Sequence, residues 1–177
     1  MKHSSTSIDD LIIAESDILG DERGSFMRLF SAEELGMQVA QANRSITTRK
    51  GSLRGLHFQR APALEAKFVR CIRGRVLDVA VDLRKGSKTF LQHFSVELDG
   101  ASGLALMIPG GFAHGFQTLT DNCEMVYFHS TPYSKEYEGG LRYDDPALGI
   151  HWPLPVADMS ARDKVFAMID DSFKGID

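Results

Sequence analysis

The chain lacks the features that would direct it to a membrane, to nucleic acid or out of the cell. No stretch approaches the roughly 20 apolar residues that cross a bilayer, and the opening MKHSSTSIDD has no apolar signal-peptide core. Lys and Arg form no runs and the formal net charge is −4, which gives little reason to expect nucleic acid or an anionic membrane as the partner. We expect a cytoplasmic protein whose cations serve local purposes.

Cysteine is nearly absent. Cys71 and Cys123 each lie inside an apolar run typical of a strand and form neither a CxxC motif nor a closely spaced framework, so we favour buried free thiols. Internal repeats, linkers and low-complexity tracts are missing too. A chain of 177 residues can bury a core without disulfide or metal staples, and we expect a single domain over residues 1–177.

Short strands separated by close turns fill most of the chain. Apolar patterns, with Gly, Asp, Asn or Pro at nearly every junction, predict strands at 11–14, 26–30, 41–48, 67–72, 76–83, 90–98, 104–108, 114–119 and 124–129. Only two weak helices are expected, a short one between Ser31 and Gly36 and a C-terminal one that begins near Ser160. The pattern predicts an all-β sandwich or barrel.

Residues 53–71 concentrate side chains that can carry chemistry. Arg54, His57 and Lys67 lie within this segment, which we expect to fold like a hairpin with turns at Gly55 and Pro62. A guanidinium and an amine have no place in an apolar core, because burying unpaired charge costs several kcal/mol. The segment therefore indicates proton chemistry beside an anionic ligand.

Other polar residues have plainer interpretations. Asp78 and Asp82 share one face of the strand 76–83, and structural salt bridges to Arg70, Arg84 or Lys67 are favoured over catalysis. The polar face of 41–48 is as well explained by an exposed edge strand as by ligand binding. The histidines favoured as hydrogen-bonded structural residues are His93, His129 and His151.

Two segments resemble the paired motifs of cupins, which are small jelly-roll barrels. The first is GLHFQ at 55–59, and the second is PGGFAH at 109–114. Metal-binding cupins carry His-x-His in the first motif, but Gln59 stands where the second His would be. The set of ligands is therefore too small for an open catalytic metal centre, and we expect no metal.

A longer series of motifs carries a more specific resemblance. In chain order these are RGSF at 23–26, the strand with Gln41, Asn43 and Ser45, then LRGLHFQ, AKFVRCIRG, DVAVDLRKGS, IPGGFAHGF, STPY, DDP and GIHWP. Over most of its length the chain thus resembles the dTDP-4-dehydrorhamnose 3,5-epimerase family. The resemblance implies a cofactor-free cupin homodimer that acts on a nucleotide-linked 4-keto-6-deoxy-hexose, foremost dTDP-4-dehydro-6-deoxy-glucose, and inverts carbon 3 and also carbon 5.

The resemblance also implies how protons move. Hydrogens beside a ketone are acidified because the resulting carbanion is an enolate, so inversion needs a base on one face and an acid on the other. His57 matches the base, and Asp163 matches the carboxylate that orients it, although Asp163 could instead cap a helix with Ser160. Lys67 would stabilise the enolate.

The acid is assigned to a tyrosine. Tyr133, in STPYSKE, is matched to the family's proton donor, and Tyr127 and Tyr137 are the alternatives. Further matches are substrate contacts, at His114 and Glu138, and contacts to the nucleotide and diphosphate, at Arg23, Phe26, Arg28, Gln41, Asn43 and Arg54.

Arg28 departs from the family pattern. The family's RGxFxE places Glu at this position, and a guanidinium has the opposite hydrogen-bonding character. Alternatives therefore stay open: a CDP-, GDP- or UDP-linked sugar, inversion of carbon 3 only, or a non-catalytic cupin that binds a sugar nucleotide. A metal-dependent cupin isomerase or dioxygenase is a further class.

Overall fold

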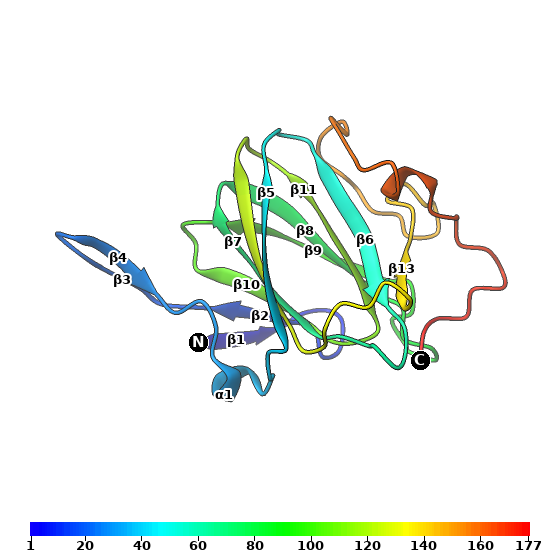
Figure 1. Cartoon of the computed structure of the whole chain (residues 1–177), viewed down its shortest axis with the longest axis horizontal. Coiled ribbons are helices and arrows are strands. Elements are labelled where there is room, and N and C mark those ends of the chain that lie inside the picture. Colours follow the sequence, from blue (N-terminus) through cyan, green and yellow to red (C-terminus); the bar gives the residue numbers. More distant parts are fainter.

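Two antiparallel sheets face each other in a computed structural model that describes residues 1–177 (Figure 1). The six-stranded sheet has the order β1 (Lys2–Ser5), β2 (Ile12–Glu15), β10 (Leu104–Ile108), β7 (Lys67–Arg73), β12 (Cys123–His129), β5 (Gln41–Thr47). The five-stranded sheet has the order β13 (Glu138–Gly140), β6 (Leu53–Gln59), β11 (Phe112–Thr118), β8 (Arg75–Asp82), β9 (His93–Asp99). The all-β prediction is confirmed.

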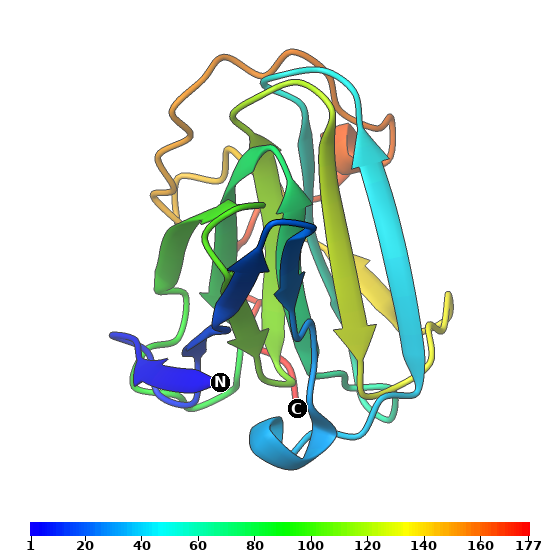
Figure 2. The same ribbon diagram turned by 90° about the vertical axis from the view of Figure 1, so that its left-hand side faces the viewer.

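The main core lies between the sheets. Val69, Cys71 and Met125 from the six-stranded sheet pack in one cluster with Val76 and Phe116 from the five-stranded sheet. Because side chains alternate along a strand, Tyr127 and His129 share the inward face of β12 with Met125. The same period places Gln41, Asn43 and Ser45 together on β5, at the sheet edge that Figure 2 shows in cyan.

The C-terminal segment covers the outer face of the five-stranded sheet. Val79, Val81 and Leu83 point outward there and pack with Leu141 and Leu148. The neighbouring inward position on β8 is Asp78, which is therefore directed into the barrel. Asp82 forms the predicted ion pair with Arg84, at 2.9 Å.

The central segment does not fold as a hairpin. β6 and β7 belong to different sheets, because residues 60–66 lead the chain across from one sheet to the other. Gly55 is not a turn but an interior position of β6 with φ 126°. A Cβ there would come within 2.6 Å of the Gly115 Cα on β11, so only glycine permits this close approach.

The two helix predictions had different outcomes. The short helix α1 (Ala32–Leu35) is confirmed, with the Ser31 hydroxyl accepting from the Glu34 N–H and Gly36 in the left-handed region. The C-terminal helix is wrong beyond one 3₁₀ turn, Asp163–Val165. The chain becomes extended at Phe166, and the residues that follow pack against the five-stranded sheet instead of coiling. None of the helices has the length and apolar composition that a membrane crossing requires.

One hairpin leaves the body of the protein. β3 (Ile18–Asp21) pairs only with β4 (Gly24–Met27), and Figure 1 shows the pair projecting away from both sheets. Leu19 and Phe26 on this arm are 65% and 68% exposed. β3, like β1 and β13, was not expected from the sequence, because strands of three or four residues are too short to show alternation.

The cysteines are buried and free, as predicted. Burial raises the pKa of Cys71 to about 12, which keeps its thiol protonated and unreactive.

Candidate active site

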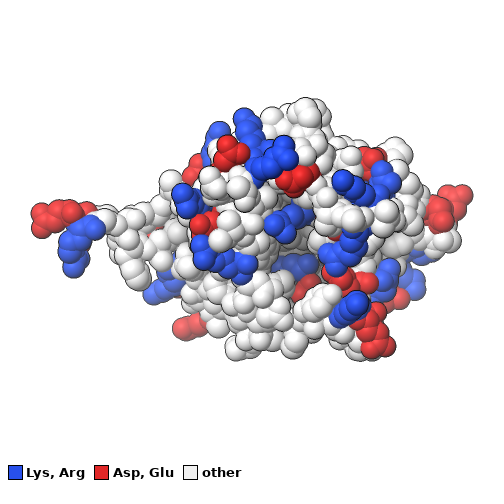
Figure 3. Space-filling view, turned by 45° about the horizontal axis from the view of Figure 1, so that its top comes forward, with Lys and Arg blue, Asp and Glu red and all other residues white.

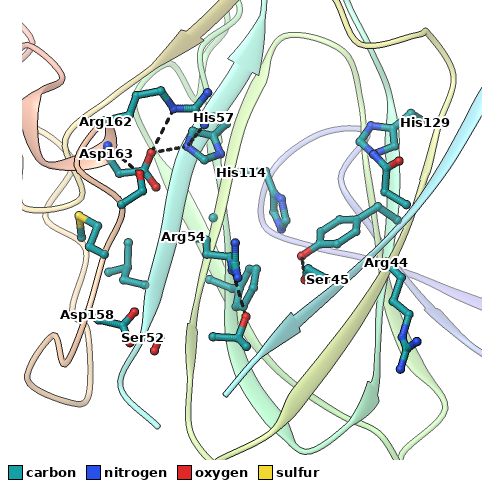
Figure 4. Close-up of a pocket in the computed structure, with 18 residues that line it drawn as sticks. Arg44, Ser45, Ser52, Arg54, His57, His114, His129, Asp158, Arg162 and Asp163 are labelled. Carbon is teal, nitrogen blue, oxygen red and sulfur yellow. Dashed lines mark hydrogen bonds and ion pairs between the residues drawn. The ribbon is translucent and has the colours of Figure 1, made fainter. Parts of the chain in front are cut away.

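A pocket of about 660 Å³ lies between the two sheets at the end where β5 finishes and β6 begins. Five of the residues predicted for the site line it: Asn43, Arg54, His57, His114 and Asp163. Figure 4 shows His57, Asp163 and Arg162 together on one side, Ser45 and His129 on the other, and His114 between them. Side chains from both sheets therefore face one cavity.

His57 and Asp163 form a hydrogen-bonded pair on one wall. The His57 Nε2 lies 2.8 Å from the Asp163 Oδ1, and the Gly55 N–H donates to the other carboxylate oxygen at 3.2 Å. Burial alone would raise the pKa of Asp163, but the hydrogen bonds from His57 and Gly55 lower it to about 2. A carboxylate that stays ionised can only accept, so Nε2 carries the proton and Nδ1 is left as the base.

Arg162 is a site residue that the sequence interpretation missed. Its Nη1 lies 2.7 Å from the Glu138 Oε2, and its Nε lies 3.5 Å from the Asp163 Oδ1. Its Nη2 lies 3.2 Å from the His57 Nε2, but a guanidinium only donates, so with a proton on Nε2 this contact is not a hydrogen bond and the two carboxylates hold the guanidinium. The signal available was its position beside Asp163 in MSARD. Arg162 joins Glu138 to the His57 pair, although the two are far apart in the chain.

His114 belongs to a second histidine–carboxylate pair. The His114 Nε2 lies 2.9 Å from the Asp78 Oδ2, and both side chains are buried. His114 is directly opposite His57 in the β11–β6 register. Asp78 therefore holds an imidazole inside the barrel, and the salt bridge predicted for it with a Lys or Arg is replaced by this contact.

A tyrosine stands on the opposite wall. The Tyr127 hydroxyl lies 2.9 Å from the Ser45 Oγ, and the Tyr127 ring centroid lies 6.2 Å from that of His114. Burial raises the pKa of Tyr127 well above its ordinary value, so the phenol stays protonated. The wall thus presents a proton donor.

Three arginines and two aspartates, Asp158 and Asp163, line the pocket, so cations outnumber anions there although the whole chain is acidic. Arg44, Arg54 and Arg162 line it, and Figure 3 shows Lys and Arg side chains bordering a hollow on this face. The Arg54 Nε donates to the Thr47 Oγ1 at 3.0 Å, which fixes the guanidinium at the pocket mouth. Such a site favours an anionic ligand.

Three predicted residues lie near the pocket but do not line it. Lys67 is buried, with its Nζ 2.9 Å from the Glu65 Oε1 and 3.4 Å from the His57 carbonyl oxygen. Gln41 donates to the Asn43 Oδ1 at 3.2 Å. Glu138 reaches the site through Arg162.

Tyr133 does not stand in the pocket. It is 53% exposed and follows β12 in a loop, and its hydroxyl donates to the Glu138 Oε2 at 3.0 Å. The strand period could have found the pocket tyrosine, because Tyr127 is in phase with the buried Cys123 and Met125.

The N-terminal predictions also fall outside this pocket. Arg23 and Phe26 lie on the projecting arm, where Arg23 pairs with Asp21 at 2.5 Å. Arg28 follows β4, and its Nη1 lies 2.5 Å from the Glu34 Oε1. Within one chain, these residues are not brought together with His57.

Comparison with known proteins decides the family. The family model described as dTDP-4-dehydrorhamnose 3,5-epimerase matches residues 5–171. A dTDP-4-dehydrorhamnose 3,5-epimerase of Methanothermobacter thermautotrophicus is 46% identical over 158 residues, which cover 86% of this chain and 84% of the relative. The chain belongs to the dTDP-4-dehydrorhamnose 3,5-epimerase family. The family resemblance seen in the sequence is confirmed.

Solved members of the family share the fold. The dTDP-6-deoxy-D-glucose-3,5-epimerase RmlC of Legionella pneumophila, in complex with dTDP-4-keto-L-rhamnose, has a TM-score of 0.86 and 41% identity, covering 92% of this chain and 89% of that one. A double mutant of ChmJ, a 3'-monoepimerase of Streptomyces bikiniensis in complex with dTDP, has a TM-score of 0.86 and 32% identity, covering 93% and 85%. The predicted cupin jelly roll is confirmed.

Proposed function

We propose that this family member inverts carbon 3 and carbon 5 of dTDP-4-dehydro-6-deoxy-glucose and so forms dTDP-4-dehydrorhamnose. The observation that carries the proposal is the pairing of an oriented base, His57 with Asp163, with a protonated phenol, Tyr127, across one pocket. The names of the curated relatives and the dTDP-sugar bound to the Legionella epimerase support the substrate.

His57 is the proposed base. Its free Nδ1 removes the proton from the carbon beside the ketone, the electron pair stays on that carbon, and Asp163 stabilises the imidazolium that forms. The carbanion is an enolate, whose negative charge a nearby cation can stabilise. Lys67 is proposed to help stabilise the enolate from behind His57. Its ammonium lies 3.4 Å from the His57 carbonyl oxygen.

Tyr127 is the proposed acid, in place of Tyr133. It reaches the cavity from the sheet opposite His57, which is the geometry that inversion demands. In the ChmJ double mutant one histidine and one tyrosine are substituted, and these positions are separated by the same number of residues as His57 and Tyr127. That correspondence supports the pairing.

The anionic part of the substrate is proposed to bind on Arg54, Gln41 and Asn43. Arg54 is suited to phosphate because its planar fork donates parallel hydrogen bonds. His114, held by Asp78, is proposed to contact the sugar between base and acid. Independence from metal and cofactor stays a prediction, as does the cytoplasmic location.

Exchange with solvent tests the function. The purified protein, incubated with dTDP-4-dehydro-6-deoxy-glucose in deuterium oxide, should replace the hydrogens on carbon 3 and carbon 5 by deuterium and yield the rhamno product, followed by proton NMR. Exchange at carbon 3 alone would instead support a monoepimerase. Binding of the nucleotide sugar without any exchange would support the non-catalytic alternative.

We propose that residues 1–177 act as one domain in a homodimer whose projecting arm completes the partner's nucleotide site. Leu19 and Phe26 expose apolar surface on the arm, and Phe26 and Arg23 match nucleotide contacts in the family although they lie outside the pocket of their own chain. Apolar side chains exposed together mark an interaction surface, and a second copy of the chain is the proposed partner that covers them.

Replacing Phe26 by Ser should therefore raise KM for the nucleotide sugar by about tenfold, the order of one lost buried aromatic contact, with little change in kcat, because His57 and Tyr127 stay in the body. Steady-state kinetics and light scattering check this. A monomeric wild type, or an unchanged KM in the variant, would contradict the arm's role.

A further inference from the structure

His129 lines the pocket and belongs to a third histidine–carboxylate pair, which has no part in the proton transfers above. His129, on β12, places its Nδ1 2.8 Å from the Glu65 Oε2. The Glu65 side chain is only 8% exposed, and that of His129 is 13% exposed. A buried carboxylate is costly unless its partners compensate, so this pair is a built element of the site rather than a surface contact.

Glu65 serves two cations. Its other oxygen, Oε1, lies 2.9 Å from the Lys67 Nζ. Burial works to raise the pKa of Glu65, but the hydrogen bond from His129 and the charge of Lys67 outweigh burial and lower it. Glu65 therefore stays ionised, and its oxygens can only accept, so the Nδ1 of His129 carries a proton.

The second ring nitrogen of His129 faces the ligand-binding side. The His129 Nε2 lies 3.3 Å from the Asn43 Nδ2, and the Asn43 Oδ1 already accepts from Gln41. In this arrangement Nε2 accepts from the Asn43 amide. If Nε2 also carried a proton, its N–H and the Asn43 N–H would be two donors facing each other. An anionic ligand that accepted from both would remove this repulsion.

The position of His129 indicates which negatively charged group could reach its Nε2. His129 is directly opposite Gln41 in the β12–β5 register, and its ring stacks with that of Tyr127 at 6.2 Å. Gln41 and Asn43 are the residues proposed to hold the nucleotide and diphosphate. Figure 4 places His129 across the pocket from His57. An anionic oxygen that bound Asn43 would therefore also meet the Nε2.

The charged surroundings of His129 are few. Strand β7 and the loop before it bring Lys67 and Glu65, and β5 brings the neutral Gln41 and Asn43. The next residue on β5, Arg44, also lines the pocket, and it is paired with Glu124 at 2.6 Å. On β12 the inward neighbour is the protonated Tyr127. One carboxylate shared between an ammonium and an imidazole can balance a second positive charge only partly, and a bound anion would supply the remainder.

We propose that His129 is a further substrate-contacting residue, which takes up a proton when the diphosphate of the nucleotide sugar binds. The proton comes from the solvent and goes to Nε2, which then donates to a phosphate oxygen, while the Nδ1–H remains on Glu65 and the Asn43 amide turns toward the ligand. This inference rests on the proposed function. It makes nucleotide affinity increase as the pH falls.

Calorimetry with dTDP as the probe tests the proposal. Titrations in two buffers of different ionisation enthalpy measure the protons taken up on binding. The wild type should take up more protons than His129→Gln, by up to about one per site. The dissociation constant of His129→Gln should be about tenfold weaker at about pH 6 and close to that of the wild type at about pH 8.5, because a charge-assisted bond is lost only where imidazole is charged.

Two further variants make the result decisive. Glu65→Gln keeps a hydrogen-bonding partner for His129 but removes the negative charge that balances it. Proton uptake on dTDP binding should therefore fall in Glu65→Gln as well. This variant keeps the proposal testable if His129→Gln folds poorly. His93→Gln is the matched control, since His93 bonds the Leu148 carbonyl oxygen at 3.0 Å outside the pocket, and it should behave like the wild type. If proton uptake and dTDP affinity were unchanged in both His129→Gln and Glu65→Gln, the inference would be overturned but the proposed function would stand. Failure of the wild type to bind dTDP would overturn the proposed function and the inference with it.

Discussion

His57→Ala should lower the rate of epimerisation by about 10²–10⁴-fold, the usual contribution of a positioned general base. The imidazole lies on the wall opposite Tyr127, and its hydrogen-bond partner stays ionised because Asp163 has a pKa of about 2. Loss of hydrogen from carbon 3 and carbon 5 in deuterium oxide, followed by proton NMR, measures the effect.

The fold should survive this substitution. The His57 side chain is part of the pocket wall rather than of a core cluster, and Asp163 keeps its contacts with Gly55 and Arg162 when the imidazole is removed. Thermal unfolding of His57→Ala should therefore resemble that of the wild type. His93→Ala, which removes an imidazole outside the pocket, is the matched control and should stay active. Ordinary deuterium exchange in His57→Ala would refute the assignment of the base.

Tyr127→Phe should lose inversion by about 10²–10⁴-fold, whereas Tyr133→Phe should stay within a few-fold of the wild type. The phenol of Tyr127 is the donor that faces the cavity, and the phenol of Tyr133 is exposed and bonds Glu138 outside the pocket. Each of the two variants loses one phenol oxygen, at a different position, so each is a control for the other. Product configuration by NMR reports inversion.

Exchange and inversion should also separate in Tyr127→Phe. His57 can still remove the hydrogen and return deuterium to the same face, so some label should enter carbon 3 and carbon 5 with their configuration retained. Removing the hydroxyl breaks one bond, to Ser45, worth about 1 kcal/mol, so the protein should still fold. An inactive Tyr133→Phe together with an active Tyr127→Phe would reverse the assignment.

Much of this could be predicted because the information is local. Alternation with a period of two is written into each strand, so β7, β8, β10 and β12 were expected within a few residues of their observed bounds. The motifs around His57 and His114 are contiguous, and they carried both the cupin fold and the family. The Ser31 cap of α1 depends on residues three apart.

The remainder depends on contacts between distant parts of the chain. The sequence favoured Tyr133 over Tyr127 as the proton donor, and only the packing of β12 against the opposite sheet shows that Tyr127 faces the cavity. Arg162 joins Glu138 to His57 across the C-terminal segment. The pair of His129 with Glu65 bridges positions 64 apart, and no local pattern links them.

The sequence by itself determined that the chain is a β protein with an imidazole at 57, a carboxylate at 163 and the motifs of one epimerase family. Tertiary structure alone decided which tyrosine faces the base, that Asp78 holds a histidine inside the barrel, and that the arm bearing Phe26 leaves its own pocket. Strand periodicity is set by backbone geometry within a few residues. The partner of a buried polar group depends on how the two sheets pack against each other. The order of residues along the chain does not give the distance between side chains on different sheets.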